Sequence, residues 1–312
     1  MSPPTGSTEP PSALEKSLHN GFAVTAEFGP PVDPDPENIR AAATALRGLV
    51  DAVNVTDNQA ATVKVSALAA SALLLREGVE PIMQITGRDR NSLAAQSDLL
   101  GAWTLGVRTV MALSGDPLKV GRYESLATHV RDLDSLGVIR LVTLLNAGEL
   151  LGGERLTTRT SFRIVAAANP LADSVQRLKS KLAAGAHLFQ TNIVYDVGRF
   201  ADWLEPVVAA GITDRAPLLV GVTPPRSTTM LRHMHDRIPG VEVDDATFAR
   251  MRDRTGEAAK AEGIAIAAEI VRGVRGIPGV AGVHLMAPGW ETEAVPAIVE
   301  AASEVLGDRA PR

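Results

Sequence analysis

Short apolar runs alternate with amphipathic, often Ala-rich segments along most of the chain. Runs rich in Val, Ile and Leu that stop at polar, Gly or Pro residues are typical of buried strands, whereas apolar positions three and four residues apart are typical of helices. The strands predicted in this way cover residues 22–27, 53–56, 80–86, 107–113, 162–168, 187–193, 217–222 and 281–286. The predicted helices cover residues 13–19, 37–48, 64–77, 91–105, 131–146, 173–184, 197–210, 227–237, 244–256, 258–274 and 292–305.

This order of elements predicts one closed barrel. Strands that alternate with helices pair in parallel, and eight such units in roughly 290 residues fit a (β/α)8 TIM barrel better than an open sheet. No G-x-G-x-x-G follows the first strand, which argues against a dinucleotide-binding open sheet. We therefore expect a single barrel domain over residues 12–312, with extra helices before the last strand, and a disordered, proline-rich tail over residues 1–11.

The first predicted strand carries a carboxylate near its end, within AVTAEFGPP at residues 23–31. Proline cannot continue a strand ladder, so the chain must leave the sheet soon after Glu27. In a parallel barrel the carboxyl ends of all strands meet at one rim, where catalytic residues collect. Glu27 is therefore either a solvated residue at a strand end or an acid of the site.

Neutral amides and hydroxyls dominate the other predicted strand ends, and together with the carboxylates they suit a polar heterocycle. Asp116, within Ser-Gly-Asp-Pro, is either a turn residue or a site acid. Gln190 and Asn192 alternate along one strand, so they are expected to share a face and to need partners there. Those partners are either a bound ligand or a polar network in the core.

Composition excludes several classes of function. The net charge of −5 argues against nucleic acid as a partner, and the lack of cysteine excludes thiolate catalysis, disulfides and thiolate metal sites. No His, Asp and Glu cluster has metal-ligand spacing, and no G-x-S-x-G supports a serine hydrolase. The chain shows neither a membrane span nor a secretory signal, so we expect a cytoplasmic location.

Several segments in combination resemble the methylenetetrahydrofolate reductase family, from about residue 20 to residue 300. The segments are AEFGPP at 26–31, VNVTDN at 53–58, QITGRDRNSLAAQSDLLGAWTLGVRTVMALSGDP at 84–117, DLDSLGVIRLV at 132–142, AAANP at 166–170 and AGAHLFQTNIVYD at 184–196. The resemblance implies a (β/α)8 barrel and an oxidoreductase of one-carbon metabolism. The implied reaction is reduction of 5,10-methylenetetrahydrofolate to 5-methyltetrahydrofolate by a nicotinamide, usually through FAD.

The resemblance also implies roles for individual residues. Glu27 matches the family's catalytic Glu, which would act as the general acid that protonates N10 and opens the imidazolidine ring. Asp116 matches the Asp of a turn near the flavin and the pterin, and is a catalytic and folate-binding candidate. The pterin contact is shared between Gln190 and Asn192, and Thr228 is a further folate-binding candidate.

The match is poorest where the family binds its flavin. Thr56, Gly115 and Lys181 stand at matching cofactor positions, but Gln84 replaces a frequent His, Ser114 replaces an Arg, and Asn169 stands in a shortened loop. Loss of these groups removes charge-assisted contacts to a diphosphate. We therefore expect FAD to bind weakly or not at all, and NADH, or else NADPH, to deliver hydride directly to the folate.

Two alternatives stay open at this point: an FAD-dependent reductase with a rearranged flavin site, and a non-catalytic folate-binding subunit of a larger complex. The arginines Arg88, Arg90 and Arg226 either meet the glutamate tail of the folate or are solvated or loop-bracing charges. The sequence does not determine the oligomeric state.

Overall fold

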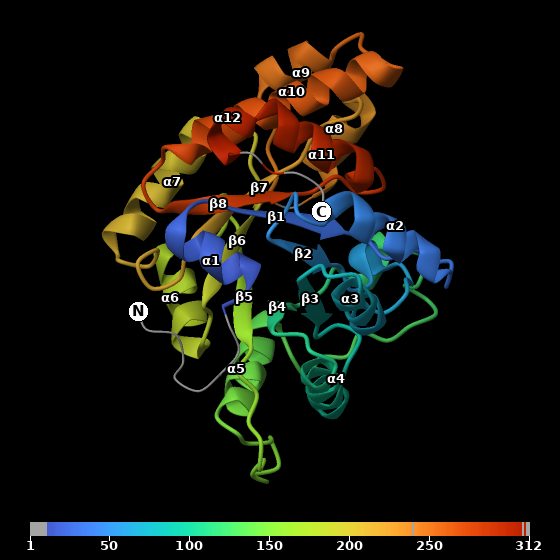
Figure 1. The fold of residues 1–312 in the computed structure, drawn as a ribbon, viewed down its shortest axis with the longest axis vertical. Coiled ribbons are helices and arrows are strands. Elements are labelled where there is room, and N and C mark those ends of the chain that lie inside the picture. The colour runs from blue at the N-terminus through green and yellow to red at the C-terminus, as the bar shows by residue number, and fades with distance from the viewer. Residues whose placement is uncertain (1–10, 239, 308, 310–312) are drawn as a thin grey trace.

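The computed structural model describes residues 11–238, 240–307 and 309, so the expected tail lies, except for Pro11, outside the described residues. Eight parallel strands close into a barrel in sequence order, from β1 through β8 and back to β1 (Figure 1). The strands are β1 (Ala23–Phe28), β2 (Ala52–Val55), β3 (Pro81–Thr86), β4 (Thr109–Leu113), β5 (Arg163–Ala168), β6 (Leu188–Ile193), β7 (Leu218–Val222) and β8 (Val280–Leu285). The predicted (β/α)8 barrel is confirmed.

Helices follow the strands and surround the barrel, and three of them stand between β7 and β8 as predicted (Figure 1). The α-helices are α1 (Ala13–Asn20), α2 (Pro36–Leu46), α3 (Ala67–Arg76), α4 (Ser92–Thr104), α5 (Ser135–Asn146), α6 (Val175–Ala184), α7 (Val197–Ala209), α8 (Thr228–Arg237), α9 (Asp245–Met251), α10 (Gly256–Arg275), α11 (Glu291–Ala301) and α12 (Ser303–Leu306). Short 3-10 turns, η1 (Gln59–Ala61) and η2 (Leu118–Val120), lie in the loops after β2 and β4.

Three predicted helices differ most from those in the structure. The helix expected from residue 131 begins at Ser135, because the side chain of Asp134 caps it by accepting a hydrogen bond from the Gly137 amide. The helix expected over 244–256 ends at Met251. The helix expected over 292–305 is divided into α11 and α12, which meet at the non-helical residue Ala302.

The lower part of the barrel is filled by apolar side chains. Its inward-facing residues form a separate buried cluster that consists of Ala23, Ala52, Ile82, Met111, Val165, Leu188 and Leu219, joined by Leu14 of α1. The helix α1 begins with a capping box between Ser12 and Glu15, and its Leu14 closes this amino-terminal end. Among the described residues, this cluster fills the amino-terminal end of the barrel, so we expect a ligand to approach from the carboxyl ends of the strands.

A buried polar layer lies above this apolar plug. The Thr25 hydroxyl lies 2.9 Å from Nδ1 of His284, and the Gln190 amide donates to Thr25 at 3.3 Å. Asn54 donates to Oε1 of Gln190 at 2.7 Å, and Gln190 donates back to Oδ1 of Asn54 at 3.2 Å. Burial lowers the pKa of His284 to about 3, so its imidazole is neutral in this layer.

Candidate functional site

Glu27 lies in the top layer of the barrel, directly above the polar layer. Outward-facing Val24, Ala26 and Phe28 pack under the helices, and alternation turns Thr25 and Glu27 inward. The Glu27 side chain is buried, with a residue exposure of 8%. Its Oε1 accepts a hydrogen bond of 3.1 Å from the side-chain amide of Gln59. The predicted acid is therefore an enclosed group at the rim.

The surroundings of Glu27 favour its protonated form. Burial is the largest cause and raises the pKa of Glu27 to about 7, because a carboxylate is poorly solvated there. The negative charges of Glu291 and Asp116 raise this pKa further, whereas hydrogen bonds from Gln59 and Gln84 lower it. A carboxyl group that keeps its proton near neutral pH can act as a general acid.

Asp116 is brought toward Glu27 by the loops above the barrel. Its Oδ2 accepts a 2.8 Å hydrogen bond from the Ala60 amide. Ala60 follows Gln59 in η1 and has a left-handed backbone, with φ of 53°, so the bond to Asp116 helps to hold a turn that alanine rarely adopts. The two predicted acids are thus linked through η1. Gln59 is not among the predicted site residues.

Arg88 braces the same loops from below. Its side chain is 1% exposed, donates to the carbonyl oxygens of Asp116 and Asn58 at 2.9 and 3.1 Å, and pairs with Asp89. Arg90 pairs with the buried Asp57 at 2.6 Å. Of the interpretations left open for these two arginines, the structure supports bracing of the loops after β2, β3 and β4.

The predicted pterin contacts, Gln190 and Asn192, occupy different places. Gln190 is 1% exposed and belongs to the polar layer, so its amide is bonded within the core. Asn192 is half-buried near the end of β6, and its Oδ1 accepts from the Ile193 amide. An extra residue in β6 relative to β7 separates them, since Gln190 pairs with Leu219 but Ile193 pairs with Gly221. The expected common face is interrupted by this bulge.

Unpaired polar atoms also mark the rim. Among the described residues, the buried hydroxyls of Thr56 and Thr223 have no hydrogen-bond partner. Both directly follow strands, β2 and β7, whose alternation turns these residues toward the barrel interior. Buried hydroxyls without partners are costly, so a polar ligand that reached these two atoms would stabilise them by hydrogen bonding.

Thr228 contributes to a contact between two helices. It is the first residue of α8, and its hydroxyl donates to the carbonyl oxygen of Met251 at 2.9 Å. This bond ties α8 to the end of α9. A folate contact by Thr228 stays a prediction.

The predicted flavin positions do not together fit a dinucleotide flavin. Lys181, the one cation among them, is buried and bonded to Asp173 at 2.8 Å and to the Ala167 carbonyl oxygen at 2.7 Å. The hydroxyl of Ser114, where the family often has Arg, accepts a hydrogen bond from the Ser135 amide. A diphosphate would therefore find no uncompensated cation at these positions.

Asn169 and Gly115, two further predicted flavin positions, have structural roles. The Asn169 side chain accepts from the Leu171 amide and packs so closely on Gly240 that a Cβ there would lie 2.0 Å from its Nδ2. Gly115 has a φ of 87°, and a Cβ on it would lie 2.8 Å from Arg88. Only Thr56 and Gln84, at the rim beside Glu27, remain placed for a ligand.

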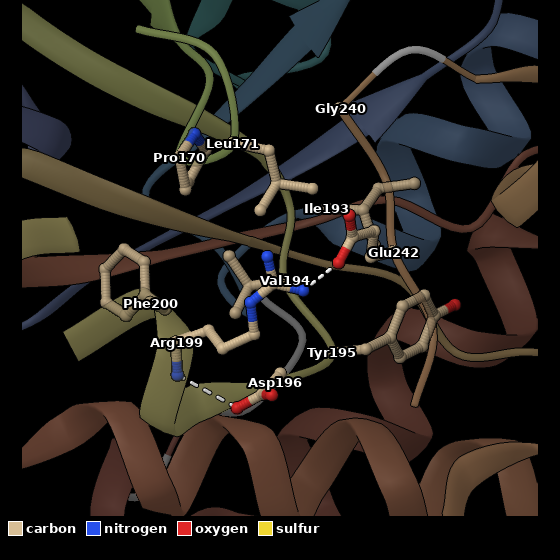
Figure 2. A pocket seen from close by; sticks show the side chains of 10 residues that line it. All are labelled: Pro170, Leu171, Ile193, Val194, Tyr195, Asp196, Arg199, Phe200, Gly240 and Glu242. Carbon is tan, nitrogen blue, oxygen red and sulfur yellow. Dashed lines mark hydrogen bonds and ion pairs between the residues drawn. The ribbon is translucent and has the colours of Figure 1, made fainter. Parts of the chain in front are cut away.

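A pocket is formed by residues at the end of β6 and in the segments after β5 and β6, together with the start of α7 and residues 240 and 242 (Figure 2). Pro170, Leu171 and Phe200 supply apolar walls, and Arg199 of α7 forms an ion pair with Glu242 across it. Neither Glu27 nor Asp116 lines this pocket. It is therefore distinct from the predicted site.

The part of the chain that the structure describes holds neither a metal-binding cluster nor a membrane-spanning helix. Within the described ranges, no three His, Asp or Glu residues are grouped so that they could hold a metal ion. No helix in those ranges combines the length and the apolar composition that a membrane crossing requires.

Together, these features define a (β/α)8 barrel protein with a buried carboxyl group at the carboxyl ends of its strands. Residues 13–303 match the family model described as methylenetetrahydrofolate reductase, so the chain belongs to the methylenetetrahydrofolate reductase family. Methylenetetrahydrofolate reductase 1 of Schizosaccharomyces pombe is 27% identical over 154 residues, which cover 47% of this chain and 23% of that protein. The matched stretch is thus less than a quarter of that relative's length.

A solved structure shares the fold. It is an uncharacterized protein from Clostridium thermocellum that binds two copies of 5-methyl-5,6,7,8-tetrahydrofolic acid. The TM-score is 0.66 over 94% of this chain and 99% of that chain, with 14% sequence identity. At this identity the likeness shows the barrel fold alone.

Proposed function

We propose that this protein reduces 5,10-methylenetetrahydrofolate to 5-methyltetrahydrofolate with NADH, or else NADPH, and that Glu27 is the general acid. Membership of the reductase family supports the reaction, and the folate bound by the protein from Clostridium thermocellum supports a folate ligand on this fold. The observation that carries the assignment is the buried Glu27 carboxyl, whose pKa of about 7 keeps a proton available near neutrality.

The proposed reaction needs one proton and one hydride. Glu27 gives its proton to N10 of the folate, the bond between N10 and the methylene carbon breaks, and an iminium forms between that carbon and N5. Hydride from the nicotinamide then adds to the methylene carbon, which becomes the methyl group. NADH and one proton are consumed, NAD⁺ is released, and solvent returns the proton to Glu27.

The residues around Glu27 would orient the folate. The unpaired hydroxyls of Thr56 and Thr223 and the amide of Gln84 can hydrogen-bond to a polar heterocycle. Asp116 and Asn192 stand at the same rim, as predicted candidates for the pterin. Gln190 would support the site from below, because its amide is bonded to Thr25 and Asn54.

We further propose that hydride passes directly from the nicotinamide to the folate. The pairing of Lys181 with Asp173 supports weak or absent flavin binding, since it leaves no free cation at the predicted flavin positions. An FAD-dependent reductase with a rearranged site is the second candidate. The visible absorbance spectrum of protein purified without added flavin distinguishes the two candidates. An FAD-dependent reductase would show the absorbance of stoichiometric bound FAD, whereas direct hydride transfer predicts no such absorbance.

Oxidation of NADH in the presence of methylenetetrahydrofolate tests the proposal. General acids contribute about 10²- to 10⁴-fold, so Glu27→Gln should lower the rate by that order. Glu205→Gln, on the exposed surface of α7, is the matched control and should retain full activity. Full activity in Glu27→Gln would refute the acid role. Intact folate binding without any turnover by the unmodified protein would instead favour a non-catalytic folate-binding subunit.

A further inference from the structure

A neutral histidine lies in the buried polar layer of the barrel. His284 of β8 pairs in register with Thr25 of β1 and with Gly221 of β7. Its neighbours Val283 and Leu285 belong to the core beneath the helices, so alternation turns the imidazole toward the barrel interior. The residue is 3% exposed, and burial holds the pKa of the imidazole far below neutrality.

Hydrogen bonds across the barrel orient the amide that reaches this layer from β6. The side-chain nitrogen of Asn54 donates to Oε1 of Gln190 at 2.7 Å and to the sulfur of Met111 at 3.3 Å. A thioether sulfur only accepts, so the nitrogen of Asn54, and not its oxygen, faces Met111. Gln190 therefore turns its oxygen toward the Asn54 nitrogen and donates from its own nitrogen to the Thr25 hydroxyl at 3.3 Å.

The Thr25 hydroxyl in turn determines which nitrogen of His284 carries the ring proton. Thr25 accepts from Gln190 and has one proton to donate, either to Nδ1 of His284 at 2.9 Å or to the Val283 carbonyl oxygen at 3.4 Å. The shorter contact favours Nδ1. In a neutral imidazole the nitrogen that accepts carries no proton, so the proton of His284 lies on Nε2.

Nε2 is thus a donor for which the fold supplies no acceptor. Among the described residues, the Thr25 hydroxyl is the one hydrogen-bond partner of the imidazole, and it lies on the Nδ1 side. An N–H group that is withdrawn from water and gains no acceptor is costly. A ligand inside the barrel that presented an acceptor to Nε2 would remove this cost.

The register of the strands places His284 one layer below the predicted site. Glu27 follows Thr25 by two residues on β1, and Thr223 follows Gly221 by two residues on the opposite flank of β8. Each residue of a parallel strand rises about 3.3 Å, so these two side chains stand one layer above the imidazole. The apolar cluster around Leu188 and Leu219 fills the barrel below. His284 therefore belongs to the floor of the space that a ligand of Glu27 would enter.

We propose that His284 is a folate-binding residue whose Nε2–H donates to a carbonyl oxygen or ring nitrogen of the pterin. An uncharged donor suits these neutral acceptors, whereas the carboxylates of the glutamate tail are better matched by a cation. The inference rests on the function proposed above, since the folate is the ligand that Glu27 would protonate. It assigns His284 a contact with the substrate and no proton transfer.

Two substitutions separate the two nitrogens of His284. His284→Asn places an amide near the position of Nδ1, so it keeps a partner for Thr25 but loses the Nε2 donor. His284→Gln places its amide near the position of Nε2, so it keeps a donor there but loses the partner of Thr25. His233→Asn, exposed on α8, is the matched control. Thermal unfolding shows whether each variant is folded, and calorimetric titration measures the binding of 5-methyltetrahydrofolate and, separately, of NADH.

His284→Asn should bind 5-methyltetrahydrofolate about tenfold more weakly, as expected for the loss of one hydrogen bond, whereas His284→Gln and His233→Asn should stay within about threefold of the unmodified protein. The reverse order for the two His284 variants would show that only the contact with Thr25 matters, and it would overturn the inference. Unchanged folate affinity in His284→Asn, or a loss confined to NADH, would also overturn it.

Nitrogen NMR of the unmodified protein, labelled with ¹⁵N in its histidine rings, gives a test that needs no folded variant at this position beyond one used to identify the signal. His284 should show a neutral imidazole protonated at Nε2, and that nitrogen should shift when 5-methyltetrahydrofolate binds. A proton on Nδ1 would overturn the inference. Failure of the unmodified protein to bind the folate would refute both this inference and the proposed function. A shift of Nε2 in a protein that never oxidises NADH would support the inference while refuting the reductase assignment.

Discussion

The side-chain amide of Gln59 donates a 3.1 Å hydrogen bond to Oε1 of Glu27, and the next residue, Ala60, donates its backbone amide to Asp116 at 2.8 Å. One turn, η1, therefore contacts both predicted acids. The donor on Gln59 stabilises the charged form of Glu27, and so it acts against the burial that keeps Glu27 protonated.

Replacing Gln59 should shift the pH dependence of the proposed reaction toward alkaline pH. Gln59→Leu removes a donor to the carboxylate, so the pKa of Glu27 should rise and the alkaline limb of kcat/KM should move up by about half to one pH unit. Gln176→Leu, exposed on α6, is the control, and a limb that moves downward in Gln59→Leu would contradict the prediction.

The raised pKa of Glu27 also predicts how stability depends on pH. Its pKa rises from 4.5 in the unfolded chain to about 7 in the fold, so the folded state holds this proton more tightly. The unmodified protein should therefore lose stability as the pH rises from about 4.5 to about 7, and the loss should level off above that range.

Glu27→Gln cannot ionise and should escape this loss. Its free energy of unfolding relative to the unmodified protein should increase by about 3 kcal/mol between acidic pH and pH about 8, at 1.36 kcal/mol per unit. Urea unfolding at several pH values measures the difference, with Glu205→Gln as the control. A difference that does not vary with pH would show that Glu27 titrates as it does in the unfolded chain.

Most of the barrel could be predicted because its signals are local. A run of apolar residues ended by polar residues, Pro or Gly sets each strand end within a few residues, and Pro30 and Pro31 are enough to place Glu27 at the rim. The polar partners could not be predicted, because they lie far apart in sequence. Gln190 meets Asn54 across the barrel, a contact that no local pattern indicates.

Glu291 shows the same limit for the site itself. It follows Pro288 and Gly289, a composition typical of an exposed loop, and it begins a helix where acidic residues are common. Only the closure of β8 against β1 buries it next to Glu27. Its burial therefore depends on tertiary structure, and an ordinary Glu at a helix start gives no sign of it.

Because Arg88 holds the loops after β2 and β4, replacing it should loosen these loops. Arg88→Met removes a buried cation that donates to the carbonyl oxygens of Asp116 and Asn58. The loops after β2 and β4 should then exchange their amide hydrogens faster, and the variant should lose about 3 kcal/mol of stability, because Asp89 loses its partner and buried acceptors lose their donors. Hydrogen exchange read by mass spectrometry checks this, with exposed Arg122→Met as the control. Unchanged exchange over residues 57–62 and 114–121 would contradict the bracing role.

The Lys181–Asp173 pair gives a prediction that bears on the cofactor. Both side chains are nearly buried, at 9% and 12% exposure, and their atoms lie 2.8 Å apart. Lys181→Met should cost about 3 kcal/mol, because it leaves the Asp173 carboxylate without its main partner, and Asp173→Asn with Lys181→Met should recover part of that loss.

The single variant Asp173→Asn tests the flavin argument directly. It frees the Lys181 ammonium while keeping an amide of similar size that can still accept from the Asn169 backbone amide. If the pairing is what removes the cation from a diphosphate, FAD should bind Asp173→Asn more tightly than the unmodified protein, by about tenfold for one charge-assisted contact. Quenching of FAD fluorescence measures the affinity, and Asp202→Asn on the exposed surface of α7 is the control. Equal affinity in both proteins would mean that the pairing does not decide whether the flavin binds.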